Sequence, residues 1–209
     1  MVTTTELRDL LVTERVMPII RSTSRENAVA IGRTLIDAGF RALEVSLTTP
    51  GALDAIGELA ADARAEIGAG TVLTAKDVAA ALAAGATFMV TPAVTASIEA
   101  SADAGVPVLA GALTPTEILA ALERGATAVK LFPAEFGGPA YLSALRAPFP
   151  DVPLIPVGGV DLTTGRDYLQ RGALALGVGS PLTGKATDPV DLISLALRAA
   201  AFRTLSAQE

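Results

Sequence analysis

Short apolar runs alternate with alanine-rich helical stretches along nearly the whole chain of 209 residues. The apolar runs have the length of strands and are almost uninterrupted by polar residues, a pattern typical of parallel strands that are buried on both faces. We expect strands at 16–21, 42–47, 66–70, 87–91, 107–110, 126–133, 153–157 and 173–178. Helices are expected at 24–38, 51–65, 75–84, 96–104, 115–124, 139–145 and 189–203.

Glycines recur at the ends of the helical stretches. Helical stretches end at Gly39, Gly85, Gly105, Gly125 and Gly172, because glycine adopts the left-handed conformation that closes a helix. The result is a weak internal repeat of the strand–helix type. Eight such units without a linker predict one domain over residues 1–209, an α/β fold of the (β/α)₈ TIM-barrel class. Residues 4–13 should form an extra helix that covers the bottom of the barrel, and an open doubly wound sheet is the alternative.

Charge and composition exclude several classes of function. The net charge is −6 and the isoelectric point is about 4.7, so no basic surface for nucleic acid is expected. Histidine and cysteine are both absent, which removes histidine-based triads, thiolate nucleophiles and the usual transition-metal ligands. No apolar stretch has transmembrane length, and residues 1–11 carry charges where a signal peptide would be apolar. We therefore expect a cytoplasmic protein without membrane contact and without a metal site built on histidine or cysteine.

Lys130 is the most informative single residue. It stands inside the apolar run at 126–133, and the only other lysines are Lys76 and Lys185. A desolvated ammonium gives up its proton more readily, and a neutral amine attacks carbonyl carbons. Lys130 is thus a candidate for Schiff-base chemistry. The alternative is a lysine at a strand end whose head reaches water.

Glu44 and Arg21 are further charged residues of the predicted strands. Glu44 lies between Leu43 and Val45, where a carboxylate is costly unless it is paired. It is either an ion-pair partner of Arg21 or Lys130, or the general acid and base that a protein without histidine needs. Arg21 ends the first strand and can bind a carboxylate or phosphate.

Glycines follow the last two strands at Gly158-Gly159 and Gly179-Ser180. Glycine lets backbone amides approach an anion, and barrels often bind phosphate after strands seven and eight. These segments therefore predict a phosphate site, although such pairs also occur in plain turns.

Together these motifs resemble the class I pyruvate aldolases that cleave 2-keto-3-deoxy-6-phosphogluconate or its galactonate epimer. The resemblance covers nearly the whole chain. It rests on the segments Leu43-Glu44-Val45, Gly68-Ala69-Gly70-Thr71-Val72-Leu73, Thr91-Pro92, 111–117, Val129-Lys130-Leu131-Phe132-Pro133-Ala134 and Val157-Gly158-Gly159-Val160.

The resemblance implies a homotrimer of (β/α)₈ barrels that needs no cofactor. Lys130 would form the Schiff base, and Glu44 would move protons. The resemblance assigns the remaining substrate contacts to Arg21, Thr71, Pro92, Gly111, Phe132, Gly158, Gly159, Gly179 and Ser180.

The resemblance also bears on the substrate. Members of the gluconate type usually carry an arginine four residues after the catalytic glutamate, where this chain has Thr48. Galactonate-type members have a small polar residue there, an arginine such as Arg21, and segments similar to 36–40 and 136–139. We therefore expect a phosphorylated keto-acid sugar of the galactonate type, with the gluconate type as a close second. The alternatives are another acceptor such as that of 4-hydroxy-2-oxoglutarate, a sugar-phosphate isomerase or epimerase, and a non-catalytic scaffold barrel.

Overall fold

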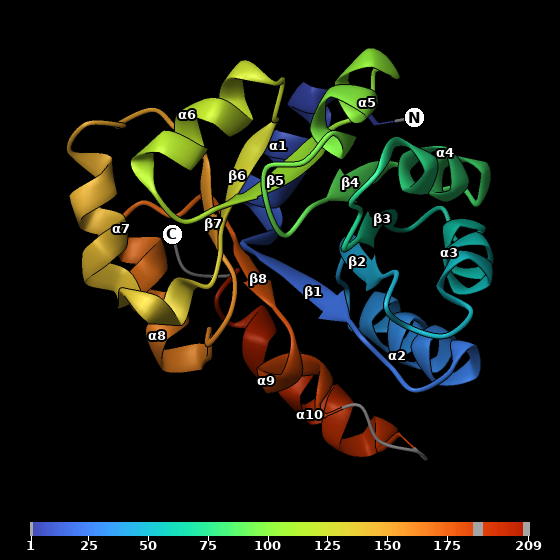
Figure 1. Ribbon diagram of the computed structural model, residues 1–209. Coiled ribbons are helices and arrows are strands. Elements are labelled where there is room, and N and C mark those ends of the chain that lie inside the picture. The colour runs from blue at the N-terminus through green and yellow to red at the C-terminus, as the bar shows by residue number, and fades with distance from the viewer. Residues whose placement is uncertain (1, 186–189, 207–209) are drawn as a thin grey trace.

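The computed structural model describes residues 2–185 and 190–206. Within them, eight parallel strands form one sheet in the order β7-β6-β5-β4-β3-β2-β1-β8 (Figure 1). The strands are β1 (Val16–Ile20), β2 (Ala42–Ser46), β3 (Glu66–Gly70), β4 (Phe88–Val90), β5 (Val108–Ala112), β6 (Ala128–Leu131), β7 (Leu154–Pro156) and β8 (Leu176–Val178).

The two ends of this strand order meet, so the sheet closes. β1 pairs with both β2 and β8. A parallel bridge joins Val157 to Gly177, and the Leu174 N–H donates to the Leu154 carbonyl at 2.8 Å. The sheet is therefore a barrel and not an open doubly wound sheet, which confirms the predicted fold class.

Helices surround the ring of strands (Figure 1). They are α2 (Arg25–Asp37), α3 (Ala52–Ala60), α4 (Ala75–Ala83), α5 (Ser97–Asp103), α6 (Pro115–Glu123), α7 (Gly138–Arg146), α8 (Leu162–Gln170), α9 (Ser180–Thr183) and α10 (Leu192–Arg203). No helix among the described residues is long and apolar enough to cross a bilayer.

The predicted N-terminal helix is present as α1 (Thr4–Glu14). It begins in a capping box made by Thr3 and Glu6, which satisfies free backbone N–H groups at the helix start. Its Leu7 and Leu11 are fully buried and belong to the same apolar cluster as Met17 of β1. Helix α1 thus closes the end of the barrel at which the strands begin.

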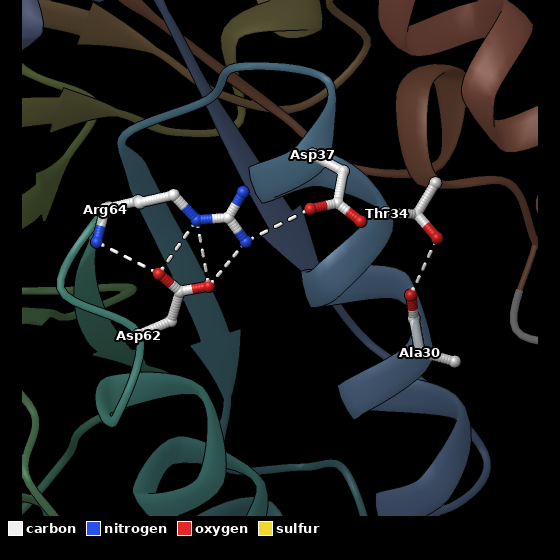
Figure 2. A network of polar contacts seen from close by, with 5 residues as sticks. All are labelled: Ala30, Thr34, Asp37, Asp62 and Arg64. Carbon is white, nitrogen blue, oxygen red and sulfur yellow. Dashed lines mark hydrogen bonds and ion pairs between the residues drawn. The ribbon is translucent and has the colours of Figure 1, made fainter.

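One expected helix is shorter than its alanine content predicts. Helix α3 ends at Ala60, whereas the sequence predicted Ala65. The carboxylate of Asp62 accepts hydrogen bonds from the backbone and side chain of Arg64, and Arg64 also binds Asp37 at 3.1 Å (Figure 2). These bonds lower the pKa of Asp62 to about 2. Such local side-chain bonds compete with the helix and end it.

Other differences from prediction concern the second half of the chain. Helix α8 had no predicted range; it begins at Leu162, directly after Asp161, whose carboxylate caps its first turn. β5 continues to Ala112, beyond its predicted end at residue 110. β8 begins only at Leu176, whereas the prediction began at residue 173. Helix α9 and the short 3₁₀ turn η1 (Ala134–Phe136) were also not predicted. The expected start of the last helix at residue 189 lies outside the described residues.

Candidate active site

A cavity of about 210 Å³ opens where the strands end. In a barrel of parallel strands, side chains from the carboxyl ends of the strands converge at this mouth. The lining residues are Ile19, Arg21, Glu44, Thr71, Pro92, Lys130, Phe132, Val157, Gly158, Gly159, Val160, Gly177, Gly179, Ser180 and Pro181. The structure therefore brings together every predicted site residue except Gly111.

Lys130 and Glu44 form the buried polar centre of this cavity. Lys130 Nζ lies 3.9 Å from Glu44 Oε1, and the two side chains are 8% and 1% exposed. Glu44 Oε2 is buried and has no hydrogen-bond partner in the described part of the chain. At this distance the two charged groups attract each other, but the distance is too long for a hydrogen bond. The Lys130 amine can therefore bond to an atom of a bound molecule. An orphaned carboxylate oxygen beside a buried amine suits proton transfer to or from a bound molecule.

Gly70 makes room for the Glu44 carboxylate. A Cβ atom at position 70 would lie 2.0 Å from Glu44 Oε1, far inside van der Waals contact. Glycine at this position of β3 thus lets the carboxylate of the neighbouring strand lie flat against the backbone.

An aromatic ring and a guanidinium stand nearer to solvent. The Phe132 ring centroid is 5.4 Å from Lys130 Nζ, within cation–π range. Arg21 follows β1 directly and is exposed. Both therefore contribute to the outer wall, where Arg21 offers a positive charge to an anionic molecule.

The glycine segments take conformations that ordinary residues avoid. Gly158 and Gly159 have φ angles of 96° and 71°, in the left-handed region that glycine adopts without strain. A Cβ atom at Gly179 would have open space around it, with no atom of the described residues beyond its two chain neighbours within 4 Å, and Gly179 directly precedes Ser180, the first residue of α9. Backbone amides and the Ser180 hydroxyl are thus the polar groups on this side of the cavity.

Gly111 lies behind the wall instead of lining the cavity. It is in register with Lys130 on the adjacent strand, and its N–H donates to Thr91 Oγ1 at 3.2 Å. A Cβ here would lie 2.1 Å from the Pro92 carbonyl carbon. Gly111 therefore lets the Pro92 backbone pack closely, and a direct contact with substrate stays a prediction.

The packing of Gly111 predicts a loss of stability on substitution. Gly111→Ala should lower the free energy of unfolding by about 1–3 kcal/mol, since a backbone clash forces the wall to shift. Urea denaturation measures this change. Gly57→Ala is the control: it lies in the exposed middle of α3, where the new Cβ would lie 3.3 Å from Ala84 O, so it should change stability much less than Gly111→Ala does. Equal stability of Gly111→Ala and the native chain would contradict the packing argument.

Sequence reasoning missed a row of hydroxyls beside the cavity. Ser46 Oγ lies 2.8 Å from Thr48 Oγ1 and 2.9 Å from Thr71 Oγ1. The available signal was the period of two along a strand: Ser46 shares the face of β2 with Glu44 and must also point into the barrel.

The arrangement is suited to covalent chemistry on a carbonyl. A buried amine is the nucleophile, a nearby carboxylate moves protons, and an arginine and glycine amides can bind anionic groups. Among the described residues, no group of three or more carboxylates could hold a metal ion.

Comparison with known proteins agrees with this chemistry. A family model described as KDPG and KHG aldolase matches residues 7–193. The 2-dehydro-3-deoxy-phosphogluconate aldolase of Pseudomonas aeruginosa is 42% identical over 158 residues, which cover 74% of this chain and 72% of that protein. A probable 2-dehydro-3-deoxy-6-phosphogalactonate aldolase of Rhizobium meliloti is 39% identical over 168 residues, covering 78% and 79%.

Solved structures give the same picture. A structure described as native KDPGal has a TM-score of 0.83 and 34% identity, and the match covers 91% of this chain and 93% of that one. The KDPG aldolase of Legionella pneumophila, with pyruvate captured as a covalent carbinolamine, has a TM-score of 0.79 and 29% identity, with 95% of each chain covered.

Proposed function

This chain belongs to the KDPG and KHG aldolase family and is a class I, Schiff-base lyase, and we propose that Lys130 and Glu44 are its catalytic pair. The observation that carries this proposal is the buried pair itself, 3.9 Å apart at the mouth of the barrel. We propose one catalytic domain over residues 1–209, with a 2-keto-3-deoxy-6-phospho-aldonate as the substrate.

The reaction begins at the C2 ketone of the substrate. Lys130 Nζ adds to this carbon, and the carbinolamine loses water to become an iminium ion. The positive nitrogen is then an electron sink for the bond that must break. The cavity wall keeps the amine largely out of water, since Lys130 is buried.

Cleavage follows from the position of Glu44. Its carboxylate takes the proton of the C4 hydroxyl, the C3–C4 bond breaks, and the bonding electrons pass into the iminium to give an enamine. Glyceraldehyde 3-phosphate leaves. Glu44 then assists protonation of the enamine at C3, and hydrolysis of the new iminium releases pyruvate and the free amine.

We assign the distal phosphate to Gly158, Gly159, Gly179 and Ser180. These residues line the same cavity as Lys130, and glycine backbones allow close approach of N–H groups to an anion. Arg21 and Thr71 are assigned to the keto-acid carboxylate or neighbouring oxygens. Pro92 and Phe132 are assigned to the apolar wall of the cavity.

The galactonate epimer is the favoured substrate. Position 48 holds an exposed threonine in place of the arginine that gluconate-type members usually carry, and Arg21 supplies a guanidinium from β1. The named relatives include both types at similar identity, so the choice rests on these residues. The gluconate epimer is the second candidate.

Cleavage of both 6-phospho epimers, each with its dephospho counterpart, tests substrate and phosphate site together. Loss of several charge-assisted hydrogen bonds should reduce kcat/KM of the dephospho substrates by about 10²-fold or more. We expect the galactonate epimer to be cleaved at least as fast as the gluconate epimer. Exclusive cleavage of the gluconate epimer would overturn the branch assignment.

A variant that adds a negative charge tests where the substrate phosphate binds. Ser180 is exposed at the start of α9, so Ser180→Asp adds a negative charge there with little effect on folding. It should lower kcat/KM for the phosphorylated substrate by about tenfold or more relative to the isosteric Ser180→Asn, through like-charge repulsion. With the dephospho substrate, kcat/KM should differ far less between the two variants. Equal losses for both substrates would place the phosphate elsewhere.

We also propose that the protein assembles as a homotrimer, as the sequence resemblance implies, and that it is located in the cytoplasm, as the charged residues within 1–11 suggest. Large apolar side chains at the surface support an assembly: Phe136, Ile193 and Leu197 are at least 70% exposed. Exposed side chains of this kind are a common mark of contact surfaces.

A further inference from the structure

Ser46 is the middle member of the row of hydroxyls beside the active site. It is fully buried as the last residue of β2, two positions after Glu44. Its Oγ is 2.8 Å from Thr48 Oγ1 and 2.9 Å from Thr71 Oγ1. The three hydroxyls thus connect the exposed Thr48 to Thr71 in the cavity wall.

Thr71 has a backbone conformation that requires support. Its φ angle is 60°, in the left-handed region where a β-branched residue is strained. Strained residues of this kind cluster at functional sites and persist only when neighbouring groups hold them. The bond to Ser46 holds the Thr71 hydroxyl directly, and it fixes the direction in which the remaining hydrogen or lone pairs of that hydroxyl face.

Ser46 has a single hydroxyl proton, so it can donate to Thr71 or to Thr48 but not to both, and these two choices give the row opposite directions. If Thr48 donates to Ser46 and Ser46 donates to Thr71, the proton of Thr71 is free to donate into the cavity. In the opposite direction Thr71 offers only lone pairs there. An anionic oxygen in the cavity requires the first direction, because an anion only accepts hydrogen bonds.

We infer that Ser46 is a positioning residue that orients the Thr71 hydroxyl as a donor to an anionic oxygen of the keto-acid substrate. This rests on the proposed function, which supplies the anion. Thr48 is the outer end of the row and does not line the cavity described above. Position 48 therefore acts on the substrate through Ser46 and Thr71, without touching it.

The test is a double-mutant cycle in the intact protein, assayed with the phosphorylated keto-acid. Removing a donor that binds the substrate and the transition state equally well raises KM and leaves kcat unchanged. Ser46→Ala should raise KM about tenfold with kcat within about threefold, and Thr71→Val should raise KM at least as much. Because Ser46 acts through Thr71, adding Ser46→Ala to Thr71→Val should change KM less than about twofold.

Two further variants separate this role from a structural one. Thr48→Val breaks the row at its exposed end, so it leaves folding intact and should raise KM by about threefold. Ser101→Ala removes another fully buried hydroxyl, which donates to the Ser97 carbonyl of its own helix α5 at 2.6 Å, and should leave KM unchanged.

The possible negative results separate failure of the positioning role from failure of the proposed function. Additive effects of Ser46→Ala and Thr71→Val, or an unchanged KM in Ser46→Ala, would overturn the positioning role while an active native enzyme upholds the proposed function. A native enzyme that cleaves no keto-acid aldol would overturn both.

Discussion

Borohydride reduction in the presence of pyruvate should attach one reduced pyruvyl group to Lys130 and to no other lysine. Lys130 Nζ is the amine within the cavity, whereas Lys76 and Lys185 are exposed. Lys130→Ala should abolish both trapping and aldol cleavage, because without the iminium the C3–C4 bond has no electron sink. Peptide mass mapping after proteolysis identifies the labelled residue.

Two controls separate nucleophilicity from charge and from general reactivity. Lys130→Arg keeps a positive charge near Glu44 but cannot form a Schiff base under these conditions, so it should also be inactive. Lys76→Ala removes an exposed lysine of α4 and should trap and turn over normally. Label on Lys76 or Lys185, or activity in Lys130→Arg, would refute the assignment.

Much of the barrel could be predicted because parallel strands and their helices leave a strong apolar pattern. β3 was predicted to the residue at 66–70, and α1 to within one residue of its end. The number of units predicted a closed barrel, but the contact that closes the sheet could not be predicted from the apolar pattern. Closure depends on the bridge between Val157 and Gly177, a contact between residues twenty positions apart whose pairing no local pattern specifies.

The site was predictable where a residue conflicted with its surroundings. A lysine and a glutamate within apolar strands are costly, so Lys130 and Glu44 could be identified from the sequence. Gly70 could not, because a glycine at a strand end is an ordinary turn residue, and for Ser46 the sequence offered only the period of two that places it on the same face of β2 as Glu44. Their roles appear only through neighbours on other strands: the carboxylate that Gly70 accommodates and the Thr71 hydroxyl that Ser46 binds.

Local dipeptide patterns predicted Gly158, Gly159 and Gly179, which line the cavity, but not the packing around Gly111. The sequence placed Gly111 at the end of a strand and in the substrate site. The structure places it inside β5, against the backbone of Pro92. A contact between adjacent strands depends on their register, and register follows from the whole sheet.

Glu44→Gln should lower turnover by about 10²–10⁴-fold, the usual cost of removing a general acid and base. The amide keeps the shape that Gly70 accommodates but cannot take the C4 hydroxyl proton or return one to the enamine. Borohydride trapping at Lys130 should therefore persist at a reduced rate, while exchange of the pyruvate methyl protons with deuterated solvent should fall together with cleavage. Steady-state kinetics and proton exchange followed by NMR measure the two effects.

Glu14→Gln is the matched control for this variant. Glu14 is also a buried carboxylate paired with a cation, Arg203 Nη1 at 2.7 Å, but it ends α1 at the opposite end of the barrel. Its loss should reduce stability, because it leaves a cation without its partner, and should leave turnover nearly unchanged. If Glu44→Gln behaved in the same way, with stability reduced and turnover intact, Glu44 would be a structural partner of Lys130. A selective loss of proton transfer at Glu44 is what its 3.9 Å distance from Lys130 and its orphaned oxygen predict.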